Sequence, residues 1–95
     1  MFGRDPQRRT KRKLVALTNA LGRARSEVSL LESQLGTFDE DAEEAHIATL
    51  LSGHRATRTD RESEEYAALI HERLEAARRE VVALEVRRDT LLLEL

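Results

Sequence analysis

The sequence has no cysteine and only one proline, four glycines and three aromatic residues among its 95 residues. The absence of cysteine excludes disulfide bonds and thiolate chemistry. The scarcity of proline, glycine and β-branched residues leaves few turns and little of the material that β-sheets favour. A chain of this length buries only about 60% of the surface that its unfolded form exposes. We therefore expect neither a β-sheet nor a large enclosed catalytic cavity.

Long apolar runs are also missing. The chain contains no stretch of about 18 consecutive apolar residues, and its N-terminus lacks the apolar core of a signal peptide. We therefore expect a cytoplasmic protein without a membrane role. Ala, Leu, Glu, Arg and Lys make up more than half of the residues, a composition typical of long helices and coiled coils. The preference for Arg over Lys is typical of a GC-rich bacterial genome.

The charge is unevenly distributed along the chain. Residues 1–13 hold six bases and one acid, whereas residues 14–95 hold ten bases and seventeen acids. This pattern predicts a basic N-terminal arm on a mildly acidic body. Because Lys and Arg neutralise phosphates, the arm is a candidate for nucleic-acid contact. The candidate residues are Arg8, Arg9, Lys11, Arg12 and Lys13.

Apolar residues in the first half of the chain recur alternately three and four residues apart. The positions are Leu14, Leu17, Leu21, Ala24, Val28, Leu31, Leu35 and Phe38, and they continue weakly through Ala42 and Ala45. This heptad spacing predicts a helix over about residues 8–52 that packs against another helix along one narrow stripe. Gly36 and the capping-box pattern Thr37-x-x-Glu40 favour a kink or restart of the helix near residues 36 and 37. The unbroken heptad phase across this point argues against one.

A second heptad stripe follows a predicted turn. Ser52-Gly53 ends the first apolar pattern, and residues 53–59 are expected to form the turn. Thr59-x-x-Glu62 has the form of a capping box, so we expect the last helix over about residues 60–95. Its stripe positions are Ala67, Ile70, Leu74, Ala77, Val81, Leu84, Arg88, Leu91 and Leu95.

The two stripes predict an all-α fold, an antiparallel coiled-coil hairpin formed by residues 14–95, which assembles into a larger helical bundle. The alternative is a three-helix bundle in which residues 38–52 form a separate short helix. Apolar residues beside the second stripe exceed what one neighbouring helix can cover, so we expect them to contact another chain. These interface candidates are Leu69, Val82, Val86, Leu92 and Leu93.

Signals for chemistry are weak. Ser52, His54 and Asp60 are close only in sequence, and no motif holds a nucleophile beside a base. Glu43-x-x-His46 places two ligands on one helix face, but the motif occurs once, whereas di-iron bundles use it twice. We therefore expect no catalytic site, no metal and no cofactor. Near the turn, three arginines could hold an anion at the start of the last helix if Thr59 caps it, although a solvated loop is the simpler interpretation. They are Arg55, Arg58 and Arg61.

The sequence therefore favours a non-enzymatic adaptor or regulatory protein that binds another protein, or itself, through apolar heptad stripes. The alternative is a nucleic-acid-associated or transcription-regulating module with a basic arm. A remote alternative is a sensor of a small anionic ligand, such as a nucleotide, at the arginine-rich turn.

Overall fold

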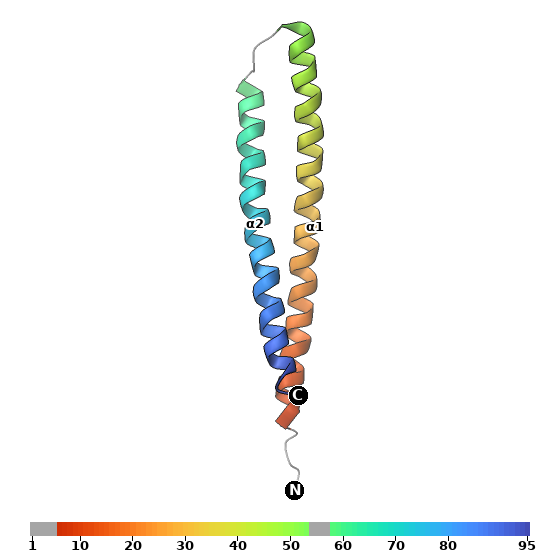
Figure 1. The fold of residues 1–95 in the computed structure, drawn as a ribbon, viewed down its shortest axis with the longest axis vertical. Helices are drawn as coiled ribbons and strands as arrows, with labels where there is room; N and C mark the ends of the chain where they lie inside the picture. The colour runs from red at the N-terminus through yellow and green to blue at the C-terminus, as the bar shows by residue number, and fades with distance from the viewer. Residues whose placement is uncertain (1–5, 54–57) are drawn as a thin grey trace.

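The fold is a hairpin of two long antiparallel helices (Figure 1). The computed structural model describes residues 6–53 and 58–95, and the side chains of residues 7–53 and 61–95. Helix α1 spans Pro6–Ser52 and helix α2 spans Arg58–Leu92. The molecule is a rod of 82 × 17 × 14 Å, and the start of α1 and the end of α2 lie at the same end of it. The predicted all-α hairpin is confirmed, and the three-helix alternative is wrong because residues 38–52 belong to α1.

Local sequence explains the ends of α1. Pro6 stands at the first helical position, where its fixed φ suits a helix and its missing N–H costs no hydrogen bond. At the other end Gly53 adopts a φ of 71°. That left-handed conformation is easy only for glycine and commonly follows the last helical residue. The Gly53 amide donates to the Thr49 carbonyl at 2.9 Å. The predicted end at Ser52-Gly53 is confirmed.

Helix α1 continues through Gly36 and Thr37, so the expected kink or restart is wrong. The Thr37 hydroxyl donates to the Ser33 carbonyl at 3.2 Å, one turn back in the same helix. Thr37 therefore bonds within the helix instead of capping a new one. The heptad phase outweighs the glycine, whose cost in a helix interior is only about 1 kcal/mol.

The ends of α2 differ from the sequence prediction by two or three residues. The helix begins at Arg58, so Thr59 lies inside it and is not the residue that precedes it. Its regular part ends at Leu92 instead of 95. In the last turn Glu94 N–H bonds to the Leu91 carbonyl at 3.0 Å, and Leu95 N–H bonds to the Leu92 carbonyl at 3.2 Å. This shift to the tighter three-residue bonding is common at helix ends.

The core consists of the two predicted heptad stripes. Every stripe residue from Leu14 to Phe38 and from Ala67 to Leu91 is buried or half-buried. Two clusters make up the centre of the core. One is Leu31, Leu35, Ile70, Leu74 and Ala77, and the other is Leu21, Ala24 and Leu84. We call residues 14–38 and 67–91 the stem.

Ion pairs across the stem repeat with the heptad. Arg25 pairs with Glu85 at 3.9 Å, and Glu32 pairs with Arg78 at 3.2 Å. The second pair lies seven residues further along α1 and seven residues back along α2, so the antiparallel register is constant between them. Glu27 and Arg73 form a further ion pair, at 3.8 Å. All of these groups are largely exposed, so each pair contributes between about 0 and 1 kcal/mol and serves mainly to set the register.

Above the stem the helices no longer share a core. The last cross-helix apolar contact we observe is an edge-on pair of the Phe38 and Tyr66 rings, with centroids 5.3 Å apart and planes at 63°. Beyond it the two ribbons diverge toward the turn (Figure 1), and the stripe residues Ala42 and Ala45 are exposed. We call residues 39–53 and 61–66 the turn end.

Candidate protein-interaction surface

The exposed apolar surface of α2 centres on Val82 and Val86. They lie one helical turn apart on α2, outside its heptad stripe, and their exposed fractions are 60% and 59%. Leu93 lies seven residues beyond Val86, on the same face, and is 88% exposed. Leu92 beside it is 49% exposed. We call these four residues the α2 row. The hairpin leaves the row uncovered.

The structure does not bring the fifth candidate, Leu69, into this row. Leu69 lies 13 residues before Val82, which corresponds to about 20 Å along a helix. It is 56% exposed and is close in sequence to Tyr66, at the upper limit of the stem. The interface predicted from the sequence is therefore two separate apolar sites on α2.

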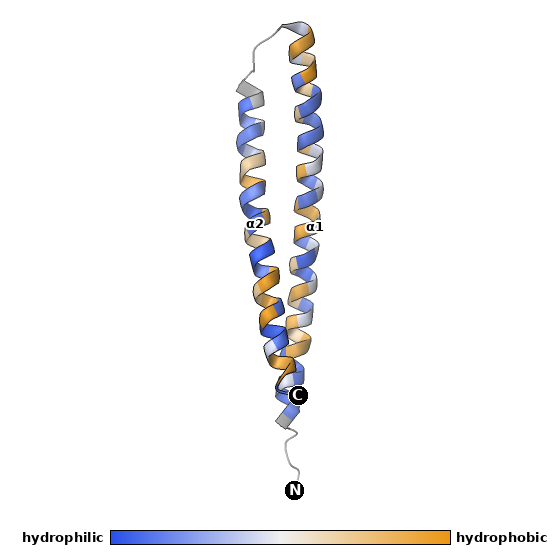
Figure 2. Cartoon of the chain, in the orientation of Figure 1, coloured by the Kyte–Doolittle hydropathy of each residue, from blue (hydrophilic) through white to orange (hydrophobic). Residues whose placement is uncertain are grey.

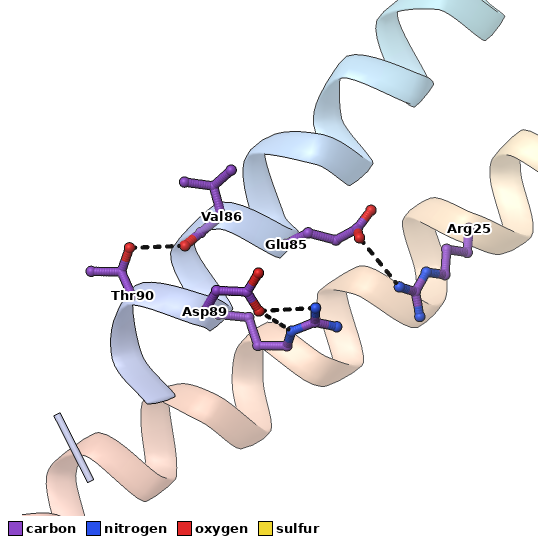
Figure 3. A network of polar contacts seen from close by, with 6 residues as sticks. Arg25, Glu85, Val86, Asp89 and Thr90 are labelled. Atoms are coloured by element: carbon purple, nitrogen blue, oxygen red, sulfur yellow. Dashed lines mark hydrogen bonds and ion pairs between the residues drawn. The ribbon is translucent and has the colours of Figure 1, made fainter. Parts of the chain in front are cut away.

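Polar contacts lie close to Val86 of the α2 row (Figure 3). The Arg88 side chain occupies a heptad-stripe position, and its Nε and Nη2 donate to Asp89 Oδ1 at 3.1 and 3.0 Å. The Thr90 hydroxyl donates to the Val86 carbonyl at 2.9 Å. Because Arg88 is half-buried, its aliphatic stem fills a stripe position while its charge remains near water.

A shallow open groove runs beside the row between the two helices. Val86 forms part of its wall, so the groove and the row are continuous. The lining residues come from the first third of α1 and the last third of α2. They are Lys13, Ala16, Leu17, Ala20, Leu84, Val86, Arg87, Thr90 and Leu91. A partner helix on the α2 row can therefore also reach small and aliphatic side chains of α1.

Sequence reasoning missed an exposed apolar patch at the turn end. Ile47, Leu50 and Leu51 share one face of α1, and Leu51 is 84% exposed. Figure 2 shows this apolar stretch beside the turn, next to polar segments of both helices. The sequence did contain an indication of this patch, because Ile47, Leu50 and Leu51 do not continue the heptad spacing through Ala42 and Ala45. With a helix break expected near Gly36, the heptad positions were not extended to this segment.

The candidate basic residues lie on the first turns of α1 and do not form a separate arm. Arg8, Arg9, Arg12 and Lys13 are exposed. The Gln7 side-chain amide donates to the Leu95 carbonyl at 3.2 Å, which joins the start of α1 to the end of α2. The predicted basic segment 1–13 thus overlaps helix α1 from Pro6 onward, as the expected helix start near residue 8 implied.

The arginines near the turn do not have the setting that the anion-site alternative requires. Arg55 lies outside the described residues. Arg58 is the first residue of α2, and Arg61 is exposed one turn later. An anion site capped by Thr59 requires that residue to precede the helix, whereas the helix already includes it. The capping prediction is wrong for that reason.

The described residues contain no group of three or more His, Cys, Asp or Glu side chains that could hold a metal ion. Glu43 and His46 share a face of α1, but the described structure supplies no third ligand beside them. In the same part of the chain, neither helix is long and apolar enough to cross a membrane. The exposed apolar side chains are thus the main chemical feature of the described surface.

Comparisons with known proteins add no constraint. No protein family, curated protein or solved structure matches this chain. The site must therefore be judged from its own residues and geometry.

Proposed function

We propose that the chain is a non-enzymatic helical adaptor or regulatory protein that binds another protein through the α2 row, with a second copy of the chain as the first partner to test. The observation that supports this proposal is the exposure of Val82 and Val86, at 60% and 59%, on a well-packed helix. The hairpin does not use these two valines, because its core near them is formed by Leu84 and Val81 of α2.

The energetics favour a helical partner. Burying apolar surface contributes about 25 cal/mol per Å², so the four apolar side chains of the row can supply several kcal/mol to binding. Val82, Val86 and Leu93 lie on one side of α2 and its last turn, and such a row fits the groove or ridge of another helix. The continuous groove beside Val86 extends the surface that such a partner covers.

Site-specific photo-cross-linking tests the proposal in the cell that makes the protein. A photoreactive residue at position 86 should give a defined cross-linked product, because the row contacts the partner there. The control is the same residue at position 72, where Glu72 is exposed on α2 outside the row. Equal products from both positions, or none from position 86, contradict the proposal.

A charge substitution tests the same surface in solution. We expect Val82→Glu combined with Val86→Glu to weaken assembly at least about tenfold, because it places charges into an apolar contact. The matched control is Ala68→Glu with Ala76→Glu, which adds the same charge at other exposed sites of α2. Circular dichroism should show unchanged helicity in both variants. Equal assembly of the two variants excludes the row as the contact.

Nucleic-acid binding is the second candidate, because the first twenty residues of α1, from Pro6 to Arg25, contain seven bases and no acid. Binding through this segment is expected to be non-specific. It should fall steeply as the salt concentration rises, because releasing counterions from the nucleic acid then becomes less favourable. Arg8→Glu with Arg9→Glu and Arg12→Glu should abolish DNA or RNA retention and leave the hairpin folded. Absence of any mobility shift by the unmodified chain at low ionic strength contradicts this candidate.

A further inference from the structure

Helix α1 carries its two signs of charge in separate halves. From Pro6 to Arg25 it has seven bases and no acid, and from Ser26 to Gly53 the chain has seven acids and neither lysine nor arginine. Because α1 is one continuous helix, the charges form two ends of one rigid rod. Along this rod the bases lie at the helix N-terminus and the acids lie in the C-terminal half, the reverse of the order that the helix dipole favours.

The charges are also mirrored about Ser26. Each base of the first turns has an acid at the same number of residues beyond Ser26. The mirrored pairs are Arg8 with Glu44, Arg9 with Glu43, Lys11 with Asp41, Arg12 with Glu40 and Lys13 with Asp39. The one uncharged position among the bases, Thr10, mirrors the uncharged Ala42. An antiparallel copy of the same helix would therefore place an acid at the same level along the axis as each of these bases, and Arg8, Arg9 and Arg12, which lie on or beside the outer face of α1, opposite the stem core, could pair with it.

Helix α2 supplies only part of this complement. Because the core clusters Leu84 with Leu21 and Ala24, the basic half of α1 lies beside residues 80–95, which hold two bases and four acids against its seven bases. Beside the acidic half, residues 58–79 hold five bases and six acids and so do not neutralise it. The pairs that α2 does form use Arg25, Glu27 and Glu32 near the centre of α1. Among the described residues, Arg8, Arg9 and Arg12 at one end of α1 and Glu40, Glu43 and Glu44 at the other form no ion pair with α2.

One mirrored pair, Arg12 and Glu40, lies on the face of α1 opposite the stem core. Positions 12, 19, 26, 33 and 40 recur every seven residues on this face, and all are exposed. They are Arg12, Asn19, Ser26, Ser33 and Glu40. The face thus has a base at one end, an acid at the other and small polar side chains between them, which allows a second helix to approach closely.

A shape match accompanies the charge match. Leu30, at 59% exposure, mirrors Gly22 about Ser26. A Cβ atom added at Gly22 would meet nothing within 4 Å, so the hairpin itself does not require glycine there. In an antiparallel pair centred on Ser26, the Leu30 side chain of each copy lies over Gly22 of the other. A glycine that costs about 1 kcal/mol in a helix interior then has a role.

We propose that two copies of this chain pair antiparallel along the outer face of α1, about a two-fold axis that passes beside Ser26. Each copy presents the same patch, as a two-fold interface requires. The contact goes beyond the proposed function, because it uses α1 and leaves the α2 row free. The basic end of each α1 lies on the acidic end of the other, and Leu30 fills the space above Gly22.

Disulfide trapping tests the orientation, and the chain offers no native cysteine to interfere. Ser26→Cys lies at the axis and should cross-link to a second copy. Asn19→Cys and Ser33→Cys should each fail alone, because like residues are then about 21 Å apart along the axis, whereas a disulfide needs Cα atoms within about 7 Å. A mixture of these two variants should cross-link, since residue 19 of one copy faces residue 33 of the other.

Charge reversal tests the complementarity. One variant carries Arg8→Glu, Arg9→Glu and Arg12→Glu, and the other carries Glu40→Arg, Glu43→Arg and Glu44→Arg. Each alone should weaken self-association about a hundredfold, since several surface pairs turn from attraction to repulsion. An equal mixture of the two should restore association, and so should the chain that carries all six changes. Since every changed residue is exposed, circular dichroism should show all variants folded.

Three outcomes overturn the inference: a monomeric chain at millimolar concentration and low salt, self-cross-linking of Asn19→Cys as efficient as that of the mixture, or no rescue by the six-residue exchange. Failure is distinguishable from failure of the proposed function. If Val82→Glu with Val86→Glu abolishes assembly while the Asn19 and Ser33 variants never cross-link, the α2 row stands and the α1 pairing is excluded. If Ser26→Cys and the mixture cross-link while position 86 captures nothing, the reverse holds.

Discussion

The stem and the turn end consist of the same two helices, but only the stem has a buried core. In the stem, large apolar residues such as Leu31, which is 2% exposed, lie beside the buried Ala24 and Ala77 in the heptad stripe. In the turn end the stripe continues with Ala42 and Ala45, which are too small to reach across to α2 and remain exposed. The larger side chains of this region, Ile47 and Leu51, lie outside the stripe and are exposed. Spacing alone therefore does not hold two helices together: alanines at the spaced positions are buried in the stem, where large apolar residues pack around them, and exposed in the turn end, where none do.

The sharpest way to break this comparison is to truncate one leucine in each region. Leu31→Ala should lower the free energy of unfolding by about 2 to 5 kcal/mol, because it removes buried contacts and leaves a cavity. Leu51→Ala should change it by less than about 0.5 kcal/mol, since the side chain is already in water. Urea denaturation of both variants measures the difference. Equal losses would show that the turn end is packed as firmly as the stem.

The two glycines of the turn side of α1, one after the helix end and one inside the helix, should respond oppositely to substitution by alanine. Gly53→Ala should destabilise the hairpin by about 1 kcal/mol, since a φ of 71° is unfavourable for a residue with a Cβ. Gly36→Ala should stabilise it by about 1 kcal/mol, because the position is helical and a Cβ there meets nothing within 4 Å. Thermal unfolding of both variants checks the opposite signs. Destabilisation by Gly36→Ala would restore the discarded break in α1.

The ion pairs across the stem should give the smallest effect. Glu32→Gln removes the pair with Arg78 and should cost no more than about 0.5 kcal/mol, because both groups are exposed. The cost should disappear in high salt, where such charges are screened. The matched control is Glu75→Gln, an exposed acid on α2. A loss above that of Leu31→Ala would mean that charges and not apolar packing hold the stem.

Much of the stem could be predicted from the sequence. The heptad phase identified the buried face of each helix from Leu14 to Phe38 and from Ala67 to Leu91, because a repeat of three and four residues is set by helix geometry. The end at Gly53 was equally predictable, since glycine suits the left-handed residue after a helix. These features depend on local chemistry and on one strong period.

The remaining features needed the structure. Gly36-Thr37 has the local sequence of a helix break. The helix nevertheless continues, because Leu35 before it and Phe38 after it both pack against α2. The predicted start of the last helix was two residues too late, because a capping pattern at Thr59 does not fix a helix end to within two residues. The separation of Leu69 from the α2 row depends on axial distance, which a list of apolar residues does not contain. The continuity of α1 also turned scattered charges into two opposed ends of a single rod.

Native-state amide hydrogen exchange measures the difference between the packed stem and the turn end directly, because it reports the stability of each helical segment in the intact chain. We expect amides of Leu31, Leu35 and Ile70 to exchange only with unfolding of the whole hairpin. Those of Ile47 and Leu50 should exchange at least about a hundredfold faster, through local opening of the turn end. Equal protection along all of α1, measured in a dilute monomeric sample, would show that the turn end is packed as firmly as the stem.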